Sequence, residues 1–137
     1  MSARLALGLS LFFGLVVGSL LYANRPKEPP ARVADEVHET LVLGKGLYET
    51  SCAACHGQDG WGYAQADVPA PALNGSEHAW HHPDEQILEL IKRGGRLMPA
   101  VGADWTDKEI EAVWAYVKQW WTPEQRRLQA GEIGETF

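Results

Sequence analysis

Two cysteines and a histidine stand close together in the stretch Cys52-Ala53-Ala54-Cys55-His56. The chain has 137 residues and no other cysteine, so these thiols cannot form the framework of a disulfide-stapled fold. C-x-x-C-H is the attachment signature of c-type haem. Thiols one helical turn apart can each add to a vinyl group of one porphyrin, and the imidazole that follows can ligate the iron. We therefore expect one covalent haem c, held by Cys52 and Cys55, with His56 as the proximal iron ligand.

A redox dithiol and half of a zinc site are the two alternatives for a C-x-x-C pair. A structural zinc site needs further ligands, but the sequence has no second cysteine pair. A thioredoxin-like dithiol needs a βαβ context, and no stretch of this chain alternates apolar and polar residues for long enough to predict a strand. Both alternatives therefore fit the sequence less well than haem attachment.

Helices are expected to position these residues. Apolar side chains at Leu43, Leu47 and Tyr48 predict a helix that runs into the cysteine pair. Residues 81–95 predict another helix, because they carry a first-turn proline, acids after it, basic residues in the last turn and a glycine stop. Residues 57–80 are rich in glycine and proline and predict a long loop. In a small domain, a loop of this length is expected to wrap around a bound group.

Two capping boxes begin the remaining helices. Thr106 and Glu109 predict the start of a helix that extends to Trp121. Thr122 and Gln125 predict the start of a short polar helix close to the C-terminus. All of the predicted elements are helices, so the expected fold class is all-α.

The second axial ligand is expected from the loop between the two central helices. Met98 is followed by Pro99 and preceded by a glycine pair, where a thioether could be held rigidly over the open face of a haem. The only other methionine is Met1, which lies beyond an apolar N-terminal segment. Thioether ligation raises the potential relative to a second imidazole. A bis-histidine iron is the alternative, with the second ligand drawn from His78, His81 and His82.

With these elements in this order, the chain resembles the single-haem class I cytochromes c over residues 40–121. The resemblance implies a small cytochrome c-like helical domain wrapped around one covalent haem. The elements that carry it are Gly44 and Tyr48, CAACHG at 52–57, PALNG at 71–75, GRLMPAVG at 95–102, and Tyr116.

The same resemblance implies roles for further residues. Gly44 and Tyr48 of the first helix are expected to cross the last helix near Tyr116. The carbonyl of Pro71 is expected to accept a hydrogen bond from the ring of the proximal histidine, which would fix the tautomer and raise the basicity of that ligand. Leu73 is expected to pack on the haem.

An apolar segment of 19 residues without a charge, residues 5–23, precedes this domain. As a helix it would reach about 28 Å, close to the hydrocarbon thickness of a bilayer. It is longer than the apolar core of a cleaved signal, and Leu21 stands where cleavage after Ala23 would need a small residue. We therefore expect residues 1–23 to be a signal anchor with a single transmembrane helix. A cleaved secretory signal is the alternative.

The rest of the chain divides by composition and charge. Residues 24–39 hold three prolines and alternating charges, and predict an extended linker. The haem domain is expected at 40–121, followed by a short helix and tail at 122–137. Residues 1–30 carry a net charge of +2 and the remaining residues a net charge of −8, within a total of −6. An acidic folded part argues against a nucleic-acid partner.

By the same resemblance, we expect a membrane-tethered one-electron carrier whose haem c iron is ligated by His56 and Met98. Its expected partners are the lipid bilayer, through residues 5–23, and membrane-bound donor and acceptor proteins of a respiratory or photosynthetic chain. Haem attachment in this family depends on export, so we expect the inner membrane of a bacterium with the haem domain on the periplasmic side. The sequence predicts no small-molecule substrate pocket and hence no enzyme. The alternative is a haem c subunit of a multi-subunit membrane oxidoreductase or oxidase.

Overall fold

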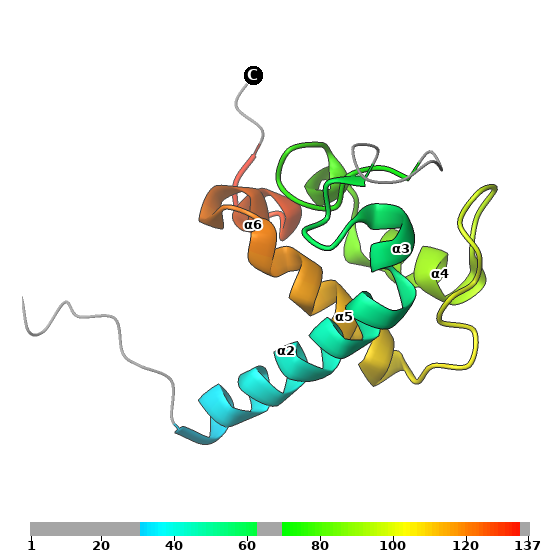
Figure 1. Ribbon diagram of the computed structural model, residues 1–137. Coiled ribbons are helices and arrows are strands. Elements are labelled where there is room, and N and C mark those ends of the chain that lie inside the picture. Colours follow the sequence, from blue (N-terminus) through cyan, green and yellow to red (C-terminus); the bar gives the residue numbers. More distant parts are fainter. Residues whose placement is uncertain (1–30, 63–69, 135–137) are drawn as a thin grey trace, which may run out of the picture. The chain divides into compact units, whose positions relative to one another are not determined.

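The computed structural model describes residues 31–62 and 70–134 (Figure 1). Within these residues all of the regular elements are helical, as predicted. Residues 34–137 form one compact unit. The elements are α2 (Ala31–Ser51), α3 (Ala53–His56), the 3₁₀ helix η2 (Ala79–His81), α4 (Asp84–Arg93), α5 (Asp107–Val117), the 3₁₀ helix η3 (Lys118–Trp120) and α6 (Pro123–Gln129).

The predicted membrane segment, residues 5–23, lies outside the described residues. Among the helices that are described, none is long and apolar enough to cross a bilayer. The linker prediction for residues 24–39 is wrong in part, because residues 31–39 form the first turns of α2 instead of an extended chain. The last of the three prolines is Pro30, and the alanine- and glutamate-containing stretch after it can form helical hydrogen bonds.

Helix α2 crosses α5 at a glycine (Figure 1). A Cβ atom at Gly44 would lie 2.0 Å from the carbonyl oxygen of Ala112, so the two backbones meet where a side chain could not fit. One turn later, Tyr48 is completely buried, and its ring centroid lies 5.7 Å from that of Tyr116 and 5.0 Å from that of Trp120. The predicted crossing of the first and last long helices near Tyr116 is confirmed.

Helices α5 and α6 begin at their predicted capping boxes, whereas α4 is shorter than the predicted 81–95 and α5 ends at Val117, before the predicted Trp121. Thr106 and Glu109 form a complete capping box at the start of α5, and Thr122 and Gln125 form one at the start of α6. Helix α4 begins after Pro83 and ends at Gly94, which has a φ of 73°. The core beneath these helices is apolar and centres on Ile91, Ile110, Val113, Trp114 and Val117.

A polar junction built around Asp84 ties α4, α5 and α6 together. The carboxylate of Asp84 accepts hydrogen bonds from Trp114 Nε1 at 2.5 Å, Lys118 Nζ at 2.7 Å and Gln129 Nε2 at 2.5 Å. Burial alone would raise the pKa of Asp84, but these donors together hold it below its ordinary value. The junction therefore keeps a charged carboxylate between three helices.

Helix α6 also holds the loop that precedes η2. Gln125 Nε2 donates to the carbonyl of Gly75 at 2.9 Å, and Arg126 donates to the carbonyl of Trp121 at 2.6 Å.

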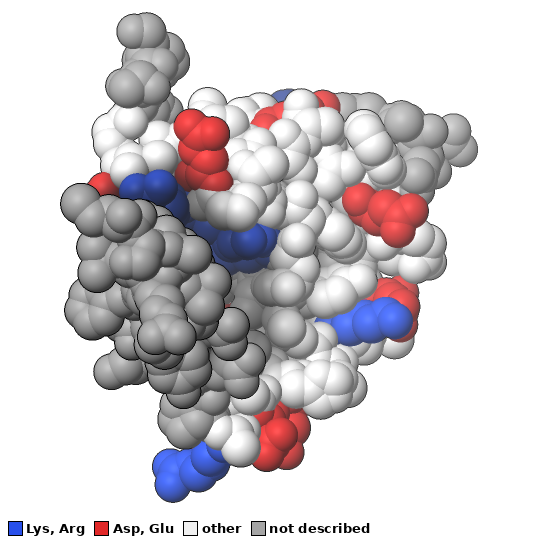
Figure 2. Space-filling view, turned by 90° about the vertical axis from the view of Figure 1, so that its left-hand side faces the viewer, with Lys and Arg blue, Asp and Glu red and all other residues white. Residues whose placement is uncertain are grey.

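On the face shown in Figure 2, acidic side chains are dispersed and much of the described surface is uncharged. Near the end of α4, Lys92 pairs with Asp107 and Arg93 pairs with Glu89.

Candidate cofactor site

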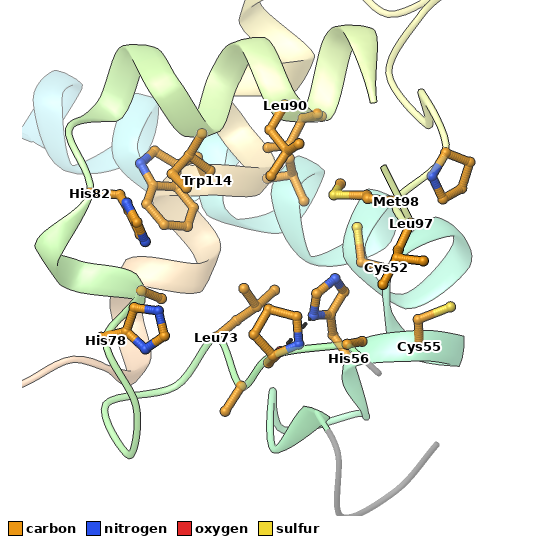
Figure 3. A pocket seen from close by; sticks show the side chains of 18 residues that line it. Cys52, Cys55, His56, Leu73, His78, His82, Leu90, Leu97, Met98 and Trp114 are labelled. Atoms are coloured by element: carbon orange, nitrogen blue, oxygen red, sulfur yellow. Dashed lines mark hydrogen bonds between the residues drawn. The ribbon is translucent and has the colours of Figure 1, made fainter. Parts of the chain in front are cut away.

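A cavity of about 240 Å³ lies between α3, α4, α5 and the two loops that connect them (Figure 3). Its walls are largely apolar, with Ile87, Leu90, Ile91 and Val113 among the lining residues. The six residues expected at the site from the sequence all line this one cavity, although they come from segments far apart in the chain. They are Cys52, Cys55, His56, Pro71, Leu73 and Met98.

The two cysteines stand on successive helical turns at the junction of α2 and α3. The backbone N–H of Cys52 donates to the carbonyl of Tyr48 at 2.9 Å, and the N–H of His56 donates to the carbonyl of Cys52 at 3.0 Å. Both side chains are free thiols. Burial and the neighbouring Cys55 raise the pKa of Cys52 to about 11, so this thiol stays protonated at neutral pH. A structural zinc site would need further ligands, and no group of three or more His, Cys, Asp or Glu side chains that could hold a metal occurs among the described residues.

His56 is 8% exposed and has one fixed hydrogen bond. Its Nδ1 lies 2.8 Å from the carbonyl oxygen of Pro71, the contact that the family resemblance implies. A carbonyl can only accept, so Nδ1 carries the proton and Nε2 keeps a lone pair for a ligand. Burial lowers the pKa of His56, and the bond to Pro71 offsets part of this effect. The imidazole is therefore held neutral, as iron ligation requires.

Glycines bring Pro71 beside this imidazole. Gly57 has a φ of 79°, and its carbonyl accepts a 2.7 Å hydrogen bond from the buried hydroxyl of Tyr48. Gly62 has a φ of 58°, and a Cβ there would lie 2.5 Å from the carbonyl carbon of Pro71. The carbonyl of Gly60 accepts the N–H of Leu73 at 2.8 Å. These contacts at residues 57–62 and 70–73, the described parts of the predicted loop next to the site, present Pro71 and Leu73 to the cavity.

Met98 reaches the cavity from the loop that follows α4, on the side away from His56 (Figure 3). The loop turns back on itself through a 2.8 Å hydrogen bond from the N–H of Gly95 to the carbonyl of Met98. A second bond, from the N–H of Gly102 to the carbonyl of Ile91 at 2.9 Å, closes its base. The neighbouring Leu97 is 62% exposed.

Two of the three histidines considered as alternative ligands also line the cavity. His78 and His82 lie at the end away from the cysteines and Met98 (Figure 3). His81 does not line it, and its ring stands edge-on to Trp80 with centroids 3.7 Å apart. Trp114 is a lining residue that the sequence predicts only as part of the core, because helical spacing marks a buried face without saying what that face contacts.

The residues around the cavity fit a haem. Two thiols, a neutral imidazole and a thioether are the functional groups that a covalently bound, axially ligated haem uses, and the remaining walls are apolar. Beside the lining residue Ala79, the indole nitrogen of Trp80 is buried without a hydrogen-bond partner among the described residues. An unpaired buried N–H costs roughly 1–3 kcal/mol.

Comparisons with known proteins agree with this geometry. The model of a family described as cytochrome c oxidase, cbb3-type, subunit III matches residues 39–117. The cytochrome bc1 complex cytochrome c subunit of Mycobacterium tuberculosis is 32% identical over 119 residues, which are 84% of this chain and 41% of that protein. Cytochrome c-551 of Bacillus subtilis is 30% identical over 112 residues, which are 80% of this chain and 94% of that protein. The chain thus spans less than half the length of the mycobacterial relative. No solved structure matches it significantly.

Proposed function

Because the chain belongs to the family of monohaem c-type cytochromes, we propose that it transfers one electron at a time through a haem c held in the cavity. Cys52 and Cys55 would anchor the porphyrin by thioether bonds. His56 and Met98 would ligate the iron, which supplies reversible one-electron exchange when the haem is bound. The observation that carries this proposal is the convergence of these four side chains on one apolar cavity.

The protein's own groups would set the properties of that centre. The hydrogen bond from His56 Nδ1 to Pro71 keeps the Nε2 lone pair directed to the ligand position and makes it more basic. Leu73 and the apolar helix faces exclude water, which lowers the local dielectric. A thioether from Met98 favours the reduced state relative to a second imidazole, so the midpoint potential would be high for a c-type centre.

We further propose that residues 5–23 anchor the protein in the inner membrane of a bacterium, with the haem domain on the periplasmic side. The sequence motivates this part, through an apolar segment of bilayer length and the export that haem attachment requires. A tether would confine the domain close to the membrane and raise its effective concentration near membrane-bound donors and acceptors.

A permanent subunit of a membrane redox complex is the second candidate function. The similarity to the mycobacterial relative, a cytochrome c subunit of a bc1 complex, favours it. Purification of the native protein in mild detergent distinguishes the two. A carrier leaves the membrane extract as a single chain, whereas a subunit stays with partner chains at fixed stoichiometry through several columns.

Replacement of Met98 tests the ligand set. Met98→Ala should lower the midpoint potential and open the iron to carbon monoxide, because the sixth position loses its protein ligand. Asp104→Ala is the matched control, since its exposed side chain belongs to the same loop and does not line the cavity. It should leave the spectrum and the potential unchanged. If Met98→Ala retains the wild-type spectrum while His78→Gln or His82→Gln loses it, the iron is bis-histidine ligated and this ligand assignment is wrong.

A further inference from the structure

His78 and His82 form a pair of imidazoles at one end of the cavity. They are four residues apart, on either side of η2, and their ring centroids are separated by 5.5 Å with the planes tilted by 58°. Figure 3 shows a nitrogen of each ring turned toward the space between the two rings. His78 is exposed and His82 is half-buried, and both rings line the end of the cavity away from the cysteines. From this arrangement we infer that the pair binds a divalent transition-metal ion such as Zn²⁺.

The hydrogen bonding of His82 prepares it as a metal ligand. Its Nδ1 lies 3.2 Å from Oε1 of Gln86, an atom that can only accept. The proton is therefore on Nδ1, and Nε2 keeps the lone pair that a metal needs. Metal-ligating histidines are characteristically oriented in this way, by a hydrogen bond from the other ring nitrogen.

Neutral imidazoles are ligands for Zn²⁺, Cu²⁺ and Ni²⁺, whereas Mg²⁺ and Ca²⁺ prefer oxygen. A metal-to-nitrogen distance of about 2.0–2.1 Å requires only that the two rings converge slightly from their present separation. No group of three or more His, Cys, Asp or Glu side chains that could hold a metal occurs in the part of the chain that the structure describes. The protein thus supplies two ligands at this site, and water completes the coordination.

His81 provides a matched control within the same three-residue turn. Its ring packs against Trp80 and is not among the lining residues of the cavity, so it does not join the pair. A site that depends on geometry must lose affinity when His78 or His82 is replaced, and must keep it when His81 is replaced. Non-specific binding by a histidine-rich surface would weaken to a similar extent in all three variants.

The test is a calorimetric titration of the purified protein with Zn²⁺. Free Cys52 and Cys55 thiols would compete for zinc, so the protein carries its haem or, where none is bound, is alkylated at both thiols. The zinc titration can therefore be done whether or not the protein binds haem, so its result does not depend on the proposed function. Wild type should bind one Zn²⁺. His78→Gln and His82→Gln should weaken binding by about tenfold or more, and Gln86→Leu by about tenfold. His81→Gln should change it by less than about twofold.

The proposed site would be contradicted if all three histidine variants lost zinc affinity equally. It would also be contradicted if His78→Gln bound zinc as tightly as wild type. A second readout rests on the proposed function. A divalent cation beside the cavity favours electron uptake, so saturating Zn²⁺ should raise the midpoint potential of wild type and leave that of His78→Gln unchanged. Bound zinc without any change in the wild-type potential would contradict the placement of the ion at the cavity.

Discussion

The wall of the cavity that carries His56 is fixed by buried contacts, whereas the wall that carries Met98 is an exposed loop shaped by its own backbone. On the first wall, α2 and α5 touch at Gly44, Tyr48 is completely buried, and His56 is bonded to Pro71. On the second wall, the chain turns at Gly94 and closes through backbone hydrogen bonds. Its side chains are half-buried or exposed.

This difference separates two tasks of a redox site. The His56 wall is held by buried contacts within the chain, which suits covalent attachment and a fixed proximal imidazole. The Met98 loop has few side-chain contacts to lose, so its side chains can adjust to a haem while the backbone turn keeps the thioether near the cavity. Substitutions on the first wall should therefore act mainly through packing, and those on the second mainly through backbone conformation.

The helix crossing should give the largest effect. Gly44→Ala places a Cβ 2.0 Å from the carbonyl oxygen of Ala112 and must push α2 and α5 apart. We expect a loss of about 2–3 kcal/mol in the free energy of unfolding, measured by guanidinium denaturation. Gly46→Ala, one half-turn away with no atom within 4 Å of the new Cβ, should instead gain about 0.5–1 kcal/mol. Equal effects at both positions would show that the crossing is not close-packed.

The junction at Asp84 should give the next largest effect. Asp84→Asn removes the charge that pairs with Lys118 and weakens acceptance from Trp114, so we expect a loss of about 1–2 kcal/mol in the free energy of unfolding. Glu85→Gln is the control, because this neighbour is exposed, and it should stay within about 0.5 kcal/mol of wild type. If Asp84→Asn is as stable as wild type, the carboxylate is not what joins the three helices.

The Met98 loop should respond to its backbone and not to its exposed side chains. Gly94→Ala is strained by a φ of 73° and places a Cβ 2.8 Å from the carbonyl oxygen of Met98. It should cost about 1 kcal/mol or more in the free energy of unfolding. Leu97→Ser should cost less than about 0.5 kcal/mol. If Leu97→Ser proves the more damaging of the two, side-chain packing holds this wall as well, and the contrast between the walls disappears.

The smallest expected effect is on the stability of the fold at acidic pH, through the N-terminal cap of α5. Hydrogen bonds from the backbone N–H and hydroxyl of Thr106 hold the pKa of Glu109 below its ordinary value. The carboxylate therefore stabilises the fold above its unfolded-state pKa, and this contribution disappears as the pH falls through the lower folded-state value. Glu109→Gln keeps the capping acceptor without a titrating group. Between about pH 5 and pH 3 wild type should lose slightly more stability than this variant, whereas parallel denaturation curves would exclude such a contribution.

Local signals predicted where the helices begin, and the residues that they marked for a cofactor line one cavity. Capping boxes at Thr106 and Thr122, and a glycine stop at Gly94, act within a single turn and can be recognised in the sequence. The C-x-x-C-H motif is equally local. The contact between His56 and Pro71 spans 15 residues and came from the family resemblance, since spacing alone does not predict a bond across a loop.

Long-range features were beyond the sequence analysis. The partners of Asp84 at Trp114, Lys118 and Gln129 are 30, 34 and 45 residues away, and each is an ordinary surface or core residue in its own helix. Residues 31–39 were misjudged because the prolines before them indicate an extended chain, although helix propensity recovers as soon as the prolines end. The facing rings of His78 and His82 depend on the 3₁₀ turn between them, which no local signal predicted.

Covalent haem is the central claim, and a measurement on the wild-type protein tests it directly. Protein purified from cells that attach haem c is extracted with acidic acetone, and the alkaline pyridine spectrum and intact mass of the pellet are recorded. We predict one haem per chain that resists extraction, and its complete loss in the Cys52→Ser/Cys55→Ser variant, with Ser51→Ala as an unaffected control. Haem that is removed by the solvent, or a wild-type chain that carries none, would contradict the account.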